Sequence, residues 1–107
     1  MNHIVQLAKK KASQSSCVYK VSAIGLDKRG NVIYKSTNKH RFMKKGGGLH
    51  AEMEVMKKAG PSLRTIVLCR VGRSGEIRPI DPCPSCAAKA KELSIKILTI
   101  RSTDVPR

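Results

Sequence analysis

The segment 64–71 constrains the fold more than any other part of this sequence. It reads Arg-Thr-Ile-Val-Leu-Cys-Arg-Val, a nearly continuous apolar run of residues that favour extended backbone. Such a run is typical of a strand buried on both faces, because a strand with one solvated face alternates apolar and polar residues. The chain therefore needs a sheet with a covering layer on each side.

The flanking segments predict the elements that build these layers. Apolar residues at helical spacing, with Asn2 as an N-cap and Gly60-Pro61 as a stop, predict helices at 2–13, 49–59 and 82–93. Period-two and apolar runs predict further strands at 17–25, 32–36, 76–80 and 95–100. The turn at 27–31 makes the first two of these strands a β-hairpin. Together they predict one α/β domain over residues 1–107, a three-layer α/β/α sandwich with a mixed sheet.

Composition limits the function classes. The chain has 22 Lys+Arg against 7 Asp+Glu, a net charge of +15, which favours a nucleic acid, a nucleotide or an anionic surface as partner over a neutral one. A basic solvated surface without a specific partner is the alternative. No apolar run approaches a membrane span, and the first residues lack the apolar core of a signal peptide. We therefore expect a cytoplasmic protein without membrane contact.

A basic loop is predicted at residues 38–48. It carries Lys39, His40, Arg41, Lys44 and Lys45 and closes on three glycines. Long loops of this kind usually bind a ligand or move. We expect it to rim a pocket, where its charges suit a phosphate and Phe42 could stack on a base. The alternative is a solvated loop with Phe42 folded onto the core.

Two short motifs at helix starts contain the residues suited to catalysis. They are His50-Ala51-Glu52 and Pro82-Cys83-Pro84-Ser85-Cys86. In a reducing compartment a close cysteine pair more often binds metal than forms a disulfide, and zinc suits two cysteines with one histidine. Three protein ligands leave one position open, as catalytic zinc requires, and Glu52 could then shuttle protons beside it.

Simpler readings exist for each residue taken alone. A lone cysteine pair also occurs in zinc ribbons and redox motifs, and Glu54 is expected on a solvated helix face. Cys17 and Cys69 are expected to be small buried residues in strands. The combination of H-x-E with P-C-x-x-C, however, is the pattern of zinc deaminases that act on bases.

On these motifs the sequence resembles the cytidine/deoxycytidylate deaminase superfamily, and especially short deaminases encoded by bacteriophages. The resemblance implies a cytidine-deaminase-like fold truncated after its fourth main strand. It also implies zinc held by His50, Cys83 and Cys86, with Glu52 as proton shuttle. By the same resemblance Asn38 would hold the sugar or base, the backbone of Ala51 would contact the pyrimidine edge, and the protein would form a homo-oligomer.

The resulting expectation is zinc-dependent deamination of cytosine to uracil in a nucleotide or nucleoside of the dCMP or cytidine type. A second reading keeps the chemistry and places cytosine or adenine in single-stranded DNA or RNA. A third is a non-catalytic, zinc-stabilised module that binds nucleic acid. That module would need a fourth protein ligand, for which Cys69, Cys17 and His40 are the candidates.

Overall fold

The computed structural model describes residues 2–15, 20–40, 48–49, 51–72 and 74–101 of the chain. Several predictions fall outside these ranges: His50 as a metal ligand, Cys17 as a buried strand residue or a zinc ligand, Phe42 as a stacking side chain, and the loop cations Arg41, Lys44 and Lys45 at the rim of a pocket. Within the described part of the chain, no helix is long and apolar enough to cross a membrane.

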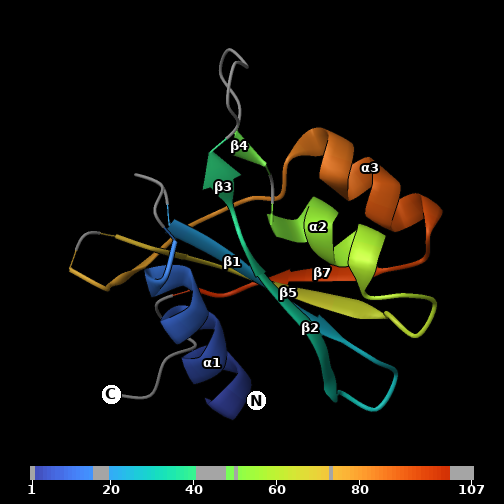
Figure 1. The fold of residues 1–107 in the computed structure, drawn as a ribbon, viewed down its shortest axis with the longest axis horizontal. Coiled ribbons are helices and arrows are strands. Elements are labelled where there is room, and N and C mark those ends of the chain that lie inside the picture. Colours follow the sequence, from blue (N-terminus) through green and yellow to red (C-terminus); the bar gives the residue numbers. More distant parts are fainter. Residues whose placement is uncertain (1, 16–19, 41–47, 50, 73, 102–107) are drawn as a thin grey trace.

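The central sheet is mixed, as the sequence predicts. It contains β1 (Lys20–Leu26), β2 (Val32–Thr37), β5 (Thr65–Val71), β6 (Ile77–Arg78) and β7 (Lys96–Thr99) (Figure 1). Strand β1 lies between β2 and β5 and is antiparallel to both. The other edge of β5 is shared, because β7 pairs in parallel with its first half and β6 pairs antiparallel with its end. This places β5 in the interior of the sheet.

The predicted hairpin is confirmed. The carboxylate of Asp27 accepts the backbone N–H groups of Arg29 and Asn31, both at 2.9 Å, and so closes the turn between β1 and β2. Gly30 has a φ of 84°, a left-handed conformation that glycine adopts without steric cost. The turn therefore depends on an acceptor at its start and a glycine near its end.

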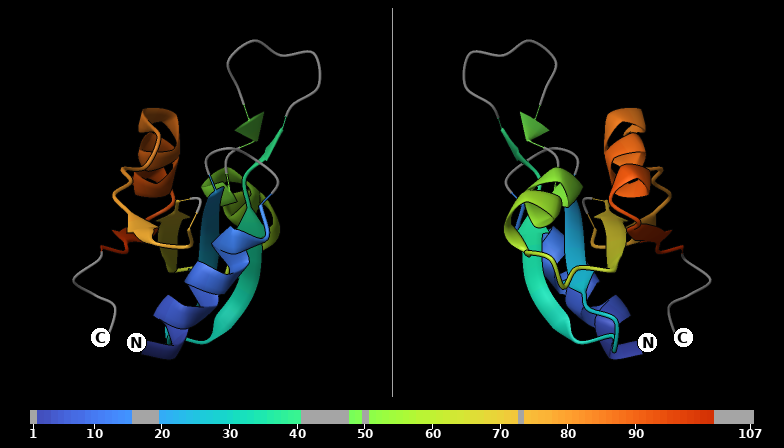
Figure 2. Two further views of the ribbon diagram at one scale, coloured as in Figure 1. Left: turned by 90° about the vertical axis from the view of Figure 1, so that its left-hand side faces the viewer. Right: turned by 90° about the vertical axis from the view of Figure 1, so that its right-hand side faces the viewer.

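Helices cover both faces of the sheet. Figure 2 shows α1 (Asn2–Ser13) on one side, with α2 (Ala51–Lys58) and α3 (Pro84–Glu92) on the other. Ile4, Val5 and Ala8 of α1 pack on Val67 and Cys69 of β5. On the opposite face, the core around α2 consists of aliphatic residues: Val21, Ala23, Ala51, Val55, Leu63, Ile66 and Leu68. The three-layer prediction is confirmed, and so is the burial of Cys69, which is 0% exposed.

The region predicted as a long loop is partly paired. Short strands β3 (Lys39–His40) and β4 (Gly48–Leu49) form an antiparallel ladder at its two ends. The prediction of a structureless segment from 38 to 48 is therefore wrong at its ends. Because β4 is followed within two residues by Ala51, this small ladder leads directly into α2.

Candidate active site

Glu52 is a buried carboxylate in the first turn of α2. The helix begins at Ala51, which is 0% exposed, and Glu52 itself is only 4% exposed. Val55, also fully buried, packs one turn further along in the core beneath the helix. A negative charge near a helix N-terminus is favourable, because the first N–H groups of a helix have no partner within it. The helix start therefore fixes an acidic group inside the molecule.

Cys83 and Cys86 lie at the start of α3. Cys83 is the N-cap residue, with φ −56° and ψ 138°, and its carbonyl accepts the N–H of Ala87 at 2.8 Å. Pro84 occupies the first helical position, where its fixed φ is suitable and its missing N–H costs nothing. Cys86 is 1% exposed, whereas Cys83 is half-buried. The extended backbone of the cap and the first helical turn thus place one thiol near the surface and the other inside.

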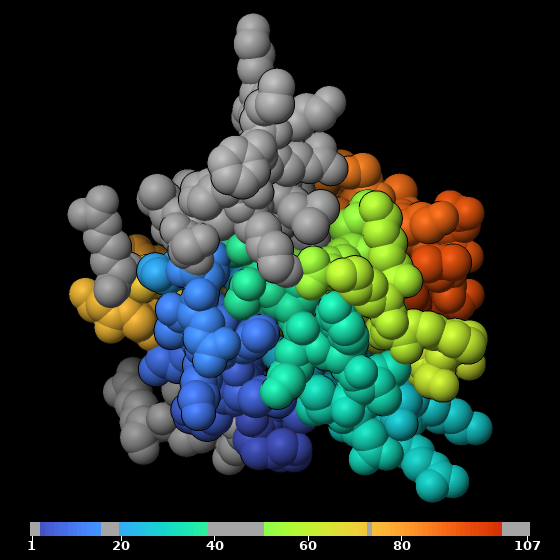
Figure 3. Space-filling view, viewed as in Figure 1, coloured from blue at the N-terminus to red at the C-terminus, as the bar shows by residue number. Residues whose placement is uncertain are grey.

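The thiols differ in acidity. Burial, with the negative charges of Glu52 and Cys83 acting in the same direction, raises the pKa of Cys86 to about 12. The hydroxyl of Ser85, whose oxygen lies 3.2 Å from the sulfur of Cys83, lowers the pKa of Cys83, and the backbone N–H of Cys86 adds to this effect. Helix α2, which carries Glu52, contacts α3, which carries Cys86. Figure 3 shows α2 and α3 packed beside one another.

The residues at these two helix starts fit a zinc ion. Cys83 and Cys86 are the soft ligands that zinc prefers, and a cation would favour their thiolate forms despite the burial of Cys86. Within the described ranges, no three His, Cys, Asp or Glu side chains are grouped to hold a metal. The third ligand expected from the sequence, His50, lies outside those ranges and directly precedes α2.

The structure places Cys69, one of the three candidates for the fourth ligand of a closed zinc site. Cys69 belongs to the core on the α1 side of the sheet, among Ile4, Val5 and Ala8. The pair Cys83 and Cys86 belongs to α3, on the other side. Cys69 is therefore separated from them by the sheet and cannot complete their coordination without refolding.

Asn38 and Ala51 were expected to contact substrate. The side-chain oxygen of Asn38 accepts the hydroxyl of Ser15 at 2.7 Å and the N–H of Val21 at 3.0 Å. These bonds tie the end of α1 to the start of β1. Ala51 is the first residue of α2 and directly precedes Glu52. Their roles toward substrate stay predictions.

Glu54 corrects one prediction. We expect this residue on a solvated helix face from the sequence, but it is only 9% exposed. Its Oε1 accepts a hydrogen bond from the hydroxyl of Ser36 at 2.7 Å. Two residues along a helix point to nearly opposite sides, so Glu54 faces β2 while Glu52 does not. Ser36 of β2, which is 2% exposed, is the polar partner under the helix, and nothing local in the sequence pairs it with Glu54. The pair fixes α2 on the sheet.

Comparison with known proteins identifies relatives of this arrangement. The family model "Cytidine and deoxycytidylate deaminase zinc-binding region" matches residues 1–101. A crystal structure of cytidine deaminase from Mycobacterium leprae is 21% identical, with a TM-score of 0.63 over 92% of this chain and 88% of that one. Cytidine deaminase from Mycobacterium tuberculosis is 23% identical, with a TM-score of 0.60 over 94% and 82% of the two chains. No curated protein sequence matches significantly.

Proposed function

Because the chain belongs to the cytidine and deoxycytidylate deaminase family, we propose that it is a zinc-dependent hydrolase that converts cytosine to uracil in a pyrimidine nucleotide or nucleoside. One observation supports this most: the carboxylate of Glu52 is buried at the start of α2, and this helix contacts α3, whose first turn holds the buried Cys86. A proton-transferring acid beside a pair of metal-binding thiols is what hydrolytic deamination of a base requires.

The proposed zinc ligands are His50, Cys83 and Cys86. Bound zinc would supply Lewis-acid chemistry, generating a hydroxide nucleophile from water near neutral pH. The two sulfurs come from one turn of α3, so that helix would orient them together. Position 50 directly precedes α2, and the start of that helix would set the place of its side chain.

Glu52 would move two protons. Its carboxylate first takes a proton from the attacking water and delivers it to N3 of cytosine, which makes C4 more electrophilic. The water oxygen bonds to C4 as a hydroxyl. Glu52 then takes the proton of that hydroxyl and passes it to the amino group, so that the C4–N bond breaks, ammonia leaves and C4 keeps a carbonyl oxygen. A residue that performs both transfers must stay close to the reacting atoms and away from bulk water, and burial in the first turn of α2 provides this.

Substrate contacts are proposed for two further residues. The backbone of Ala51 adjoins Glu52 and would face the pyrimidine edge. Asn38, whose side-chain oxygen is bonded to Ser15 and Val21 and so held in place, would contact the sugar or base. Only 3% of the residues are aromatic, which favours a mononucleotide or nucleoside over a strand whose successive bases need stacking platforms.

Purified protein loaded with zinc is incubated with cytidine, deoxycytidine, dCMP and a cytosine-containing oligonucleotide, and the ammonia released is measured. We expect turnover with at least one of the monomeric substrates. The variant Glu52→Gln should lower turnover by about 10²–10⁴-fold, the usual contribution of a general acid–base group. The control is Glu92→Gln, at an exposed position at the end of α3. No product from any substrate, or full activity of Glu52→Gln, contradicts the proposal.

The charge of +15 supports a second candidate, deamination of a base within single-stranded DNA or RNA. In the same assay this would appear as turnover of the oligonucleotide alone. Its apparent affinity would also fall steeply as salt rises, because phosphate contacts release counterions.

A further inference from the structure

The end of the fold opposite the start of α2 is strongly basic. Two turns meet there, the β1–β2 turn and the connection from α2 to β5, because the N–H of Arg64 donates to the carbonyl of Leu26 at 2.9 Å. Strand β7 begins beside them, with the N–H of Lys96 donating to the carbonyl of Arg64 at 3.0 Å. We call the cations of these segments the basic rim: Lys28, Arg29, Lys57, Lys58, Arg64 and Lys96.

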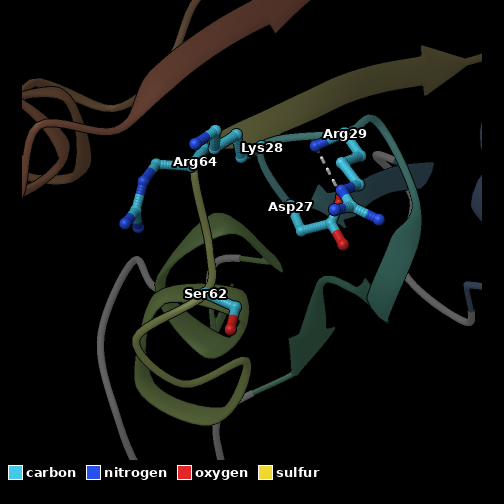
Figure 4. Close-up of a pocket in the computed structure, with 5 residues that line it drawn as sticks. All are labelled: Asp27, Lys28, Arg29, Ser62 and Arg64. Carbon is cyan, nitrogen blue, oxygen red and sulfur yellow. Dashed lines mark hydrogen bonds between the residues drawn. The ribbon is translucent and has the colours of Figure 1, made fainter.

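The basic rim contains a pocket. It has a volume of about 370 Å³ and is lined by Asp27, Lys28, Arg29, Ser62 and Arg64. Figure 4 shows Lys28 and Arg64 on one side of the group and Arg29 on the other. The guanidinium of Arg64 is held by its own loop, since Nη1 donates to the carbonyls of Pro61 at 2.7 Å and Leu63 at 3.0 Å. The pocket thus lies among cations from two turns, with the guanidinium of Arg64 held by its own loop and directed away from Asp27 and Arg29 (Figure 4).

The pocket has one acid, Asp27, against three cations, Lys28, Arg29 and Arg64. The carboxylate of Asp27 is engaged by the N–H groups of Arg29 and Asn31 and by the side-chain amide of Asn31 at 3.3 Å. Ion pairs among the described residues join Glu76 to Arg78 and Glu92 to Lys89, and none of them includes a residue of the basic rim. The rim is therefore a surface where several cations lie together with one internally bonded carboxylate.

The chemistry of the lining selects the ligand. Guanidinium, ammonium and hydroxyl groups bind phosphate oxygens, and no aromatic or aliphatic side chain lines the pocket to hold a base or a lipid chain. The cations also extend beyond the pocket to the end of α2 and the start of β7, which suits several phosphates rather than one. We propose that the basic rim binds the phosphodiester backbone of a single-stranded nucleic acid without reading its sequence.

This surface is separate from the candidate active site. The eight residues of α2 span about 12 Å along the helix axis, with Glu52 in the first turn and Lys58 in the last. The proposal therefore does not depend on deaminase activity. An oligonucleotide that contains only thymine tests it alone, because such a strand offers no cytosine to the active site.

Binding of a fluorescent thymine 20-mer to the full chain is measured by anisotropy over a series of salt concentrations. We expect log K to fall linearly with log salt, by about 0.7 for each phosphate contacted. The variant Lys28→Gln/Arg29→Gln should weaken binding and reduce this slope by roughly 1.4. The control Lys10→Gln/Lys11→Gln removes the same charge from α1, on the other face of the sheet, and should change the slope by less than half as much.

Each outcome decides the proposal. Equal effects of the two double variants would show that net charge alone attracts the strand, and absence of binding by the unaltered chain at physiological salt would also overturn it. So would displacement of the strand by inorganic phosphate at concentrations equal to those of its nucleotides, because that result assigns the pocket to a free anion. Should the double variant unfold, Lys28→Gln alone replaces it, with an expected slope change of about 0.7.

Discussion

The two ends of α2 differ in the exposure of their charged residues. At its start, Glu52 and Glu54 are 4% and 9% exposed, and Cys86 of the neighbouring helix α3 is 1% exposed. At its end, Lys57 and Lys58 are exposed near the turns that hold Lys28, Arg29 and Arg64. Burying a charged group costs free energy and shifts its pKa, which suits a group that transfers protons. An exposed charged group stays ionised and accessible, which suits the binding of a charged partner. The short helix α2 therefore separates the candidate active site from the basic rim.

The largest expected effect concerns the candidate active site. Cys86→Ser should abolish zinc binding and activity, because it removes one of the proposed ligands. Cys69→Ser is the matched control, since Cys69 is equally buried but lies in the core on the α1 side of the sheet. Zinc content by elemental analysis should be about one per chain in the control. Retention of zinc by Cys86→Ser would remove α3 from the site.

The thiols themselves provide the next comparison. Ser85 lowers the pKa of Cys83, whereas burial raises the pKa of Cys69 to about 11. In zinc-free protein at pH 8, a larger fraction of Cys83 than of Cys69 should therefore be thiolate. The thiolate is the nucleophilic form of cysteine, so the group with the lower pKa reacts faster at this pH. Alkylation by iodoacetamide, mapped by peptide mass spectrometry, should follow this order. Zinc should protect Cys83, and equal labelling of both cysteines would contradict the assignment.

A smaller effect is expected beneath α2. Ser36→Ala removes a hydrogen bond to the buried carboxylate of Glu54 and should lower the free energy of unfolding by about 1.5–3 kcal/mol. The control Ser22→Ala removes a buried bond to a neutral carbonyl, that of Ala8, and should cost about 0.5–1.5 kcal/mol. Urea denaturation measures both. A Ser36→Ala protein no less stable than Ser22→Ala would show that the charge of Glu54 adds nothing.

The smallest effect is expected at the basic end. The N–H of Asn31 holds the pKa of Asp27 below its ordinary value of 3.8, although this residue is only partly buried. A lowered folded-state pKa stabilises the fold above the unfolded-state pKa, and this contribution is lost as pH falls through the folded-state value. Asp27→Asn should therefore flatten the acid side of the stability curve slightly. A loss of stability at pH 3 as large as that at pH 7 would contradict this.

Much of the fold follows from local pattern. The predicted helix at 2–13 coincides with α1, and the apolar run at 64–71 differs from β5 by one residue. These elements are predictable because the spacing of apolar residues follows a single pattern along each of them. The sharing of one edge of β5 by β6 and β7 is not, since it depends on where two later segments return to the same strand.

The sites divide in the same way. The motifs around Glu52, Cys83 and Cys86 are visible in the sequence because the chemistry needs those residue types at those spacings. The burial of Glu54 was missed because it depends on Ser36 of a strand paired earlier in the chain. The pocket of the basic rim was missed as well, because Lys28 and Arg64 become neighbours only when two turns meet.

The central claim is that two sulfurs and one imidazole hold a zinc ion that keeps one position open beside Glu52. X-ray absorption at the zinc edge of the purified protein measures this ligand set directly. The account predicts two sulfur ligands at about 2.3 Å and two lighter ligands at about 2.0–2.1 Å, one of which exchanges with added azide or a pyrimidine analogue. Three or four sulfurs, or four ligands that never exchange, would contradict it.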